Sequence, residues 1–271
     1  MKLITLVENS PSSTCEGEHG LSFYIETQQH KLLMDFGSSD LILKNSAILG
    51  IDLKQVDTCI LSHGHYDHAG GILPFSTINP TASIYLTSTA GGDYYNLSHE
   101  YEKYIGIDKE ILNLKQCVFV DGDIRIDDEL FLFTNITGQK YPAKGNFHLK
   151  EKINGKFVQD TFRHEQCLVL SQGNQKILLS GCAHNGIINI LDRYFEVFDS
   201  YPDIVISGFH LMQKTEYSHD DLANIQAIAQ ELVKTGSLFY TGHCTGEEAF
   251  PILKEIMGEK LQHLHSGMTI L

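Results

Sequence analysis

The sequence predicts an α/β chain of the α+β type, with two sheets inside and helices packed outside. Short apolar runs that are typical of strands come first and then alternate with helical patterns, and this order occurs twice along the chain. No change in composition between the two halves marks a linker, so we expect one domain over residues 1–271. A chain of this length can bury a large core.

The elements of the first half follow from short runs between turn residues. The strand-like runs are rich in β-branched, aromatic and aliphatic residues, and the one helical run ends at Gly50. Residues 89–115 are polar and predict loops with a short helix, and residues 137–163 predict a long functional loop or lid. The expected elements are a strand at 2–7, a hairpin of 21–26 and 31–37, a helix at 39–49, strands at 56–62 and 82–88, and three strands within 117–136.

The second half repeats the pattern with clearer helices. Gly173-Asn174 predicts the turn of a hairpin. Ser218 and Asp221 have the spacing of a capping box and precede a regular apolar face. Thr245 with Glu248 predicts the start of the last helix, which we expect to end near Gly258. The expected elements are strands at 166–172 and 175–181, a helix at 186–199, a strand at 203–208, a helix at 218–236, a strand at 237–241, the last helix, and a strand at 268–271.

The overall charge limits the class of partner. The formal net charge is −14, from 34 acidic and 20 basic residues, and a field of this sign repels nucleic acid. No apolar stretch approaches the roughly 18 residues of a membrane span, and the first apolar run is too short for a signal peptide. The cysteines are scattered without a C-x-x-C pair. We therefore expect a cytoplasmic protein that binds neither nucleic acid nor membranes; its oligomeric state stays open.

Residues 61–71 read LSHGHYDHAGG and hold the strongest chemical signal in the chain. Imidazole and carboxylate at such spacing are ligands for zinc, iron or manganese. His63 and His65 point the same way along an extended segment, so both can bind one ion. Asp67 and His68 lie where the chain turns into a helix, and they can serve a second ion. A solvated turn and a closed structural metal site are the weaker interpretations, because so many ligand types seldom meet in a turn by chance, and structural sites use four closed ligands and favour cysteine, whereas this motif leaves room for a bound water.

This motif resembles the signature of the metallo-β-lactamase superfamily. The resemblance covers nearly the whole chain and implies a four-layer αββα sandwich with a metal site at the sheet edges. The later motifs resemble the branch described as dihydropterin–ribofuranosylaminobenzene 5′-phosphate synthase-like. The segments that carry the resemblance are SHGHYDHAGG, MDFG (34–37), SGCAHNGIINI (180–190), ISGFHL (206–211) and TGHCTG (241–246).

The resemblance extends the set of metal ligands into the second half. It implies that His243 is the last ligand, paired with Asp67 and His68, and that His184 is a ligand after a strand. Many members carry an aspartate that bridges two ions where this chain has Cys182. Cys182 is therefore either a thiolate ligand or a small buried residue.

Three further residues are candidates for ligating or supporting roles. By its order in the chain, His164 resembles the third histidine of the superfamily, so either His164 or His184 completes the first metal position. Glu165 resembles an acid of this branch. Asp35, at the end of a strand, is expected to orient a ligating imidazole, with a turn-forming aspartate as the alternative.

The remaining histidines divide into one candidate and several solvated side chains. His210 follows an apolar strand and is a candidate for substrate binding or acid–base catalysis, or else a core histidine. The loop of His148 could fold over the site. The histidines expected to be solvated or at the surface are His19, His99, His148, His219, His263 and His265.

The leading function is metal-dependent hydrolysis of a small ester, thioester or phosphoester, with one or two zinc ions, or iron or manganese. A metal-bound hydroxide would attack the substrate, with Asp67 as proton acceptor. The resemblance implies an alternative, a transferase that joins a pterin diphosphate to an aminobenzene ribofuranosyl phosphate. A third reading is a non-catalytic metal-bearing sensor or binding protein. The substrate is expected to be a small molecule, with anionic compounds among the candidates.

Overall fold

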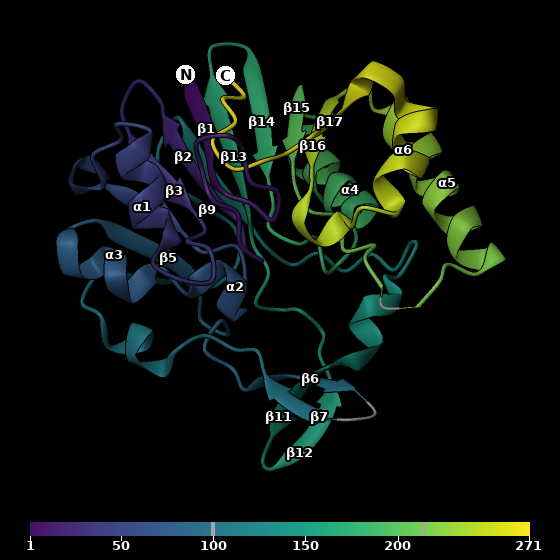
Figure 1. Cartoon of the computed structure of the whole chain (residues 1–271), viewed down its shortest axis with the longest axis horizontal. Helices are drawn as coiled ribbons and strands as arrows, with labels where there is room; N and C mark the ends of the chain where they lie inside the picture. The colour runs from purple at the N-terminus through teal and green to yellow at the C-terminus, as the bar shows by residue number, and fades with distance from the viewer. Residues whose placement is uncertain (99–100, 214) are drawn as a thin grey trace.

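The computed structural model describes residues 1–98, 101–213 and 215–271. Two sheets face each other at the centre of the molecule, and helices cover the outer face of each (Figure 1). The two termini lie close together at the same end of this sandwich (Figure 1). The arrangement confirms the predicted αββα layers. Among the described residues, no helix combines the length and apolar character needed to cross a membrane.

The first sheet comes from the first half of the chain. Its strands, in spatial order, are β1 (Lys2–Val7), β2 (Ser22–Glu26), β3 (Lys31–Met34), β4 (Thr58–Ile60), β5 (Ser83–Thr87) and β8 (Cys117–Val120). The helical segments of this half are α1 (Leu41–Ile48), η1 (Leu53–Gln55), α2 (Tyr66–Ala69), α3 (Ile72–Ile78) and η2 (Lys109–Asn113). β3, β4, β5 and β8 run parallel, so their carboxyl ends meet at one edge.

The second sheet has the strand order β17 (Leu261–His263), β16 (Leu238–Thr241), β15 (Ile204–Ile206), β14 (Gln175–Leu179), β13 (Cys167–Gln172), β10 (Leu130–Phe133) and β9 (Ile124–Arg125). Its helices are α4 (Ile187–Phe198), α5 (His219–Lys234) and α6 (Ala249–Met257), with η4 (His243–Thr245) and η5 (Gly258–Lys260). The predicted capping box of Ser218 and Asp221 is present at the start of α5. β14 to β17 run parallel, and they also bring their carboxyl ends to one edge.

The core is divided into layers because side chains alternate along each strand. In β13, Leu168 and Leu170 belong to the apolar cluster between the two sheets, whereas Val169 belongs to the cluster under the helices. In β3, Leu33 faces the helices and its neighbours face the opposite sheet. Both faces of the central strands are therefore buried, which explains why their sequences are almost continuously apolar.

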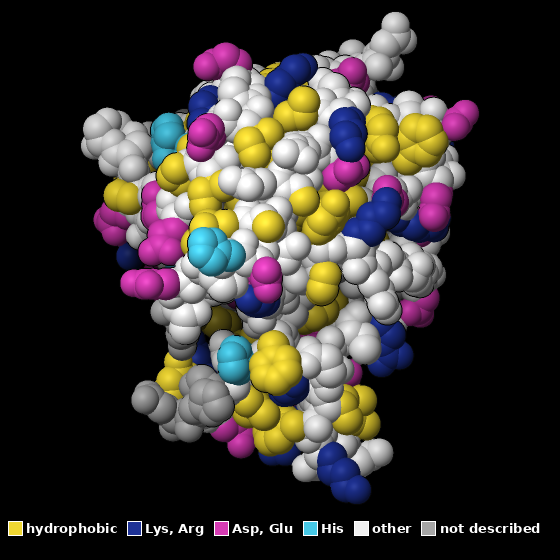
Figure 2. Space-filling model, turned by 90° about the vertical axis from the view of Figure 1, so that its right-hand side faces the viewer, with side chains coloured by type: hydrophobic (Ala, Val, Ile, Leu, Met, Phe, Trp, Pro, Cys, Tyr) yellow, Lys and Arg dark blue, Asp and Glu magenta, His cyan; other side chains and the backbone are white. Residues whose placement is uncertain are grey.

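A small third sheet corrects two predictions. Residues 89–115 contain strands as well as the short helical turn, and residues 137–163 form a short helix and a hairpin instead of a long loop. This sheet projects from one end of the sandwich (Figure 1), and apolar side chains gather on it at the lower end of Figure 2. Its elements, in spatial order, are β12 (Lys156–Gln159), β11 (Leu149–Ile153), β6 (Tyr94–Ser98) and β7 (Tyr101–Tyr104), and η3 (Lys144–His148) leads into β11.

Two expectations for the end of the chain are also wrong. Residues 268–271 form only an isolated bridge, between Ile4 and Thr269, and the last strand is β17 instead. Thr245 does not cap α6, whose first residue follows Glu248. The Thr245 hydroxyl instead accepts a hydrogen bond from the backbone of Phe209, so it ties two loops of the site together.

His30 links the two sheets through two carboxylates. Its Nδ1 lies 2.7 Å from Asp57 beside β4, and its Nε2 lies 2.5 Å from Asp127 in the turn between β9 and β10. Partial burial lowers the pKa of His30, but the hydrogen bonds to the two carboxylates outweigh burial and the net shift is upward. The stabilisation is therefore complete below the unfolded pKa of about 6.5 and is lost as pH rises through the higher folded value.

Replacing His30 with Gln should therefore destabilise the protein more in acid than in base. We expect a loss of roughly 0.5–1 kcal/mol near pH 6, the range of a partly exposed ion pair, and almost none near pH 9. Urea unfolding gives the free energy of unfolding of the parent and of His30→Gln at both pH values. Comparing the two proteins at the same pH cancels the effect of overall charge. A difference that stays constant with pH would contradict the ionic link.

Candidate metal centre

The candidate ligands collect at the carboxyl ends of strands from both sheets. His63, His65, Asp67 and His68 follow β4, whereas His184 follows β14 and His243 follows β16. In parallel sheets these ends are where ligand-binding side chains gather. The geometry brings all six residues, which the sequence separates by up to 180 positions, into one buried cluster.

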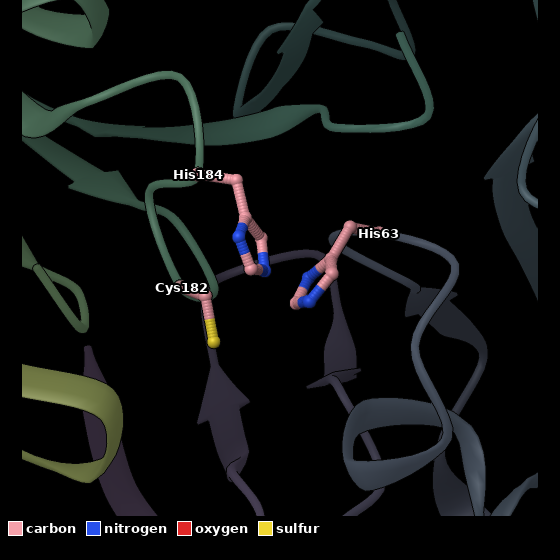
Figure 3. A group of neighbouring side chains, drawn as sticks. All are labelled: His63, Cys182 and His184. Atoms are coloured by element: carbon pink, nitrogen blue, oxygen red, sulfur yellow. The ribbon is translucent and has the colours of Figure 1, made fainter. Parts of the chain in front are cut away.

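Three imidazoles of this cluster have a buried Nε2 with no hydrogen-bond partner among the described residues. They belong to His63, His65 and His184, whose rings lie 4.7–4.8 Å apart between centroids. Figure 3 shows the His63 and His184 rings approaching from separate segments, with the Cys182 thiol beside them. Burial and the neighbouring imidazoles lower the pKa values of all three, that of His65 to about 3. Neutral imidazoles with free lone pairs are the form that binds metals.

A second group surrounds the carboxylate of Asp67. Its Oδ2 lies 3.4 Å from His243 Nε2 and 3.9 Å from His68 Nε2, and these two nitrogens are 3.3 Å apart. Around a tetrahedral metal ion, ligand atoms about 2.0–2.1 Å from the metal lie about 3.4 Å from one another. The spacing therefore fits one ion bound by Asp67, His68 and His243.

Four histidines of the centre are held in the same orientation by oxygen atoms on their Nδ1 side. A carboxylate or an amide oxygen can only accept, and the Ser62 hydroxyl already donates its proton to Asp35. Each Nδ1 therefore carries the hydrogen, and each Nε2 presents a lone pair. The pairs are His63 with Ser62 Oγ (2.8 Å), His68 with Asp35 (2.7 Å), His184 with Asn146 Oδ1 (3.1 Å) and His243 with Asn9 Oδ1 (2.8 Å).

This arrangement demands positive charge at the centre. Lone pairs of His68 and His243 face each other and the Asp67 carboxylate, and such a set is repulsive unless a cation lies between them. Without a metal, a proton on His68 supplies this charge: burial lowers the pKa of His68, yet Asp35 and Asp67 raise it to about 9, and a metal ion would displace that proton. The donor set of imidazoles and a carboxylate fits zinc, iron or manganese.

Asp35 contacts both halves of the β4 motif. It is fully buried and accepts hydrogen bonds from the backbone and hydroxyl of Ser62, each 2.7 Å, as well as from His68. Ser62 in turn contacts His63. A single carboxylate thus sets the orientation of one imidazole directly and of another through a hydroxyl. Its backbone has a φ of 60°, a conformation that Asp adopts more readily than most residues.

His164 lies next to the centre with both ring nitrogens engaged. Its Nδ1 accepts from the backbone of Gly64 at 3.0 Å, and its Nε2 lies 3.1 Å from Asp160. His184, in contrast, has a free Nε2 close to His63 and Cys182. Between the two candidates for completing the first metal position, the geometry therefore favours His184. His164 could join only after releasing Asp160, since these two and His65 form another close group.

Glu165 holds the turn that presents His184. Its carboxylate accepts from the backbones of His184 (2.7 Å) and Asn185 (3.0 Å) and from the Asn185 side chain (2.8 Å). Ala183 in this turn has a φ of 52°, an unfavourable value for alanine. Burial raises the pKa of Glu165, against these hydrogen bonds, which lower it. Glu165 therefore supports a candidate ligand, and its carboxylate oxygens are occupied by the turn that carries it.

Replacing Glu165 with Ala should loosen this turn. Two buried N–H groups would lose their acceptor, at a cost of roughly 2–4 kcal/mol in the free energy of unfolding. Urea unfolding measures the loss, and Glu165→Gln is the matched control because its amide oxygen can still accept one bond. An Ala variant as stable as the parent would contradict this role.

Several residues at the centre could not be recognised from the sequence alone. Glu8 accepts from the backbone of His243 at 2.5 Å and Asn9 accepts from its ring, both just after β1. The position after a strand was the available signal. His19 was expected to be solvated; its Nε2 instead lies 3.3 Å from Asp67, although nearly half of its side chain is exposed. His99 lies outside the described residues.

His210 and the loop of His148 also lie near this centre. The His210 ring is 4.2 Å from that of His184. The η3 segment that ends at His148 contributes Asn146, which bonds to both the ring and the backbone of His184. His219 is exposed, and His263 and His265 are partly exposed.

A cavity of about 1070 Å³ adjoins the centre at His184. Hydroxyl and amide side chains line much of it, together with Phe147, Phe162 and Arg163. The Phe162 ring stacks on His184 with centroids 4.6 Å apart. A cavity of this size is large enough for a small organic molecule.

Comparison with known proteins identifies the family. The sequence profile of the metallo-beta-lactamase superfamily matches residues 16–210, more than half of the chain. The chain belongs to this superfamily. Its members usually bind metal ions, which agrees with the clustered donors described above. The resemblance that the β4 motif predicted is thereby confirmed.

Three relatives show how far the similarity extends. The crystal structure of Tm1679, a metal-dependent hydrolase of the beta-lactamase superfamily, is 32% identical and superposes with a TM-score of 0.84, covering 100% of this chain and 98% of the other. The 7,8-dihydropterin-6-methyl-4-(beta-D-ribofuranosyl)-aminobenzene-5′-phosphate synthase of Methanocaldococcus jannaschii is 29% identical, covering 100% of this chain and 96% of the synthase. Zn²⁺-bound PqqB of Methylobacterium extorquens shares the fold at 12% identity, with a TM-score of 0.58 and full coverage of both chains.

Proposed function

We propose that this protein is a metal-dependent hydrolase of small esters, thioesters or phosphoesters. The observation that carries the proposal is the convergence of four imidazole Nε2 lone pairs with the carboxylate of Asp67. Oxygen atoms hold all four rings from behind, an arrangement that is typical of histidines bound to metal. The similarity to a metal-dependent hydrolase along the whole chain supports the same function.

Two neighbouring positions would hold the ions. His63, His65 and His184 would form one position, and Asp67, His68 and His243 the other, with zinc as the expected metal and iron or manganese as alternatives. A divalent ion there would lower the pKa of a bound water from about 15.7 towards 7 and polarise the oxygen under attack. Cys182 lies 3.2 Å from His68 Nε2 and is close to both groups, so it is a candidate thiolate ligand between them.

The residues of the chain would orient the reaction. Contacts with the His19 and His243 imidazoles hold the pKa of Asp67 well below its usual range, against the effect of burial. Its carboxylate is therefore ionised and supplies negative charge to the site. The cavity beside His184 would take the substrate, with Phe162 and Arg163 available to contact an aromatic or anionic group. His210 is a further candidate for acid–base catalysis or substrate binding.

The similarity to the Methanocaldococcus synthase supports a second candidate function. In that reading, the same centre would join a pterin diphosphate to an aminobenzene ribofuranosyl phosphate, and bound cations would stabilise the departing pyrophosphate. The cavity is large enough for either set of substrates.

One experiment separates these functions. The protein is purified without added metal, its metal content is measured, and it is assayed against ester, thioester and phosphoester panels. A parallel assay supplies a pterin diphosphate with and without the amine acceptor. Metal-dependent hydrolysis supports the first proposal, and product that requires the amine supports the synthase. Bound metal with neither reaction would favour a sensor or binding protein.

A further inference from the structure

We propose that Cys182, His210 and Cys244 form an additional binding position for a thiophilic divalent cation such as Zn²⁺. It adjoins the histidine centre and shares Cys182 with it. The position does not depend on hydrolase activity, because two of its three donors, His210 and Cys244, are not ligands of the histidine centre. Two thiolates and one imidazole are a strong zinc-binding combination.

The three donors come from the ends of three neighbouring parallel strands. Cys182 follows β14, His210 follows β15 and Cys244 lies in η4 after β16. Their ligand atoms all lie within 4.8 Å of one another, and both cysteines are buried. Zinc bound at about 2.3 Å from sulfur and about 2.1 Å from nitrogen separates its ligands by about 3.5–4 Å. Small side-chain rotations would therefore close the group on an ion.

His210 supplies the observation that points to a ligand. Both its ring nitrogens are buried, and neither makes a hydrogen bond of normal geometry among the described residues; the Cys244 thiol is the polar group that interacts with the ring. A buried polar group without a well-formed hydrogen bond is destabilising. Its backbone also has a φ of 49°, which is unfavourable for histidine. Ring nitrogens that are shielded from solvent and lie beside two thiols are well placed to bind an ion.

The surrounding backbone fixes the two sulfurs close together. Gly208 packs directly against Cys244, because a Cβ at this position would lie 2.5 Å from its Sγ. The Phe209 backbone bonds to Thr245, and the Met212 backbone bonds to the carbonyl of Cys244. These contacts hold the His210 loop against η4. Figure 3 shows that the Cys182 sulfur points away from its own backbone turn, toward the interior.

Binding of an ion at this position would release protons from the two cysteines. Each thiol that binds the ion loses one proton to solvent, while neutral imidazole binds through a lone pair and loses none. No oxidation or reduction takes place. Binding at this position therefore produces thiolate-to-metal charge transfer that involves two different cysteines, whereas the histidine centre can use only Cys182.

Titration with Co²⁺ tests the position in the full chain under reducing conditions. The metal-free protein and its variants are titrated while the near-ultraviolet thiolate band is recorded, and bound ions are counted by elemental analysis after excess metal is removed. We expect Cys244→Ser to lose one ion per chain together with the part of the band that this ion gives, so that any remaining band comes from Cys182 in the histidine centre. His210→Gln should lose the same ion. This second variant provides an independent measurement if Cys244→Ser folds poorly. Cys117→Ser, a half-buried cysteine of β8, is the matched control and should change neither readout.

The outcomes separate this position from the proposed hydrolase. If Cys244→Ser keeps the parent's stoichiometry and band, the additional position is wrong, even if metal-dependent hydrolysis is found. A band that disappears only in Cys182→Ser would assign the thiolate to the histidine centre and also overturn the inference. Asp67→Asn should abolish hydrolysis yet keep the band that depends on Cys244; loss of this band in Asp67→Asn would contradict a separate position.

Discussion

Replacing Asp67 with Ala is expected to lower kcat of the proposed hydrolysis by about 10²–10⁴-fold, which is the range for loss of a positioned acid–base group. The change in KM should be much smaller, because Asp67 acts on the proton and the ion and does not hold the substrate. Elemental analysis should show that the Asp67, His68 and His243 position loses its ion or binds it weakly.

The size of this effect follows from the contacts of Asp67. Its Oδ2 lies within 3.4 Å of two imidazole nitrogens, those of His19 and His243. Those contacts keep the pKa of Asp67 well below the usual range, so the carboxylate supplies full negative charge to the buried centre. Alanine removes that charge and leaves the lone pairs of His68 and His243 facing each other with one ligand fewer.

Steady-state kinetics and circular dichroism of Asp67→Ala make up the test. Asp128→Ala, in the exposed turn between β9 and β10, is the matched control and should keep the parent's kcat. Hydrolysis that survives in Asp67→Ala at more than about a tenth of the parent rate would mean that Asp67 is not the proton acceptor.

The sequence predicts the metal ligands best where they lie close together along the chain. The four donors between His63 and His68 lie within six consecutive residues, so their spacing alone indicates a metal site. His184 and His243 could be proposed because each follows an apolar strand and because the motifs resemble a known family. Asn9 and Glu8 also follow an apolar strand, but they lie in no recognisable motif, and their contacts with His243 join residues more than 230 positions apart.

The small sheet was missed for a related physical reason. Strand prediction relies on apolar alternation, and both YYNLS in β6 and YEKY in β7 lack a continuous apolar face. β6 also pairs with β11, so that Asn96 lies opposite Leu149 far along the chain. Strands that are stabilised by distant partners and leave one face exposed give little local signal.

His164 also shows what the sequence alone could not predict. His164 precedes a strand, and its order in the chain matches the third histidine of the family. Its exclusion from the free donors depends on Gly64 and Asp160, whose hydrogen bonds occupy both ring nitrogens. Only the folded arrangement distinguishes it from His184.

Replacing Asp35 with Asn should weaken metal binding by about 10–100-fold, the range found when a group behind a ligating histidine is changed. Asn tolerates the positive φ at this position nearly as well as Asp, so the backbone should be preserved. The variant therefore removes charge and leaves the shape of the side chain unchanged.

The effect should reach both metal positions. Asp35 accepts directly from His68, and through Ser62 it sets the hydrogen on His63. Without the carboxylate, the amide can donate as well as accept, and each imidazole can adopt the other tautomer, with its hydrogen on Nε2. An Nε2 that carries hydrogen cannot bind an ion.

Competition against a chromogenic zinc chelator measures both affinities in the parent and in Asp35→Asn. Asp128→Asn serves as the control for loss of one negative charge, since Asp128 is exposed and distant in sequence from the ligands. Weakening of the His68 position alone would show that the link through Ser62 is unimportant, and Ser62→Ala should then leave both affinities unchanged. Unaltered affinity at both positions would contradict the assignment of the oxygen-held imidazoles as ligands, because their orientation would then not depend on the carboxylate that holds them.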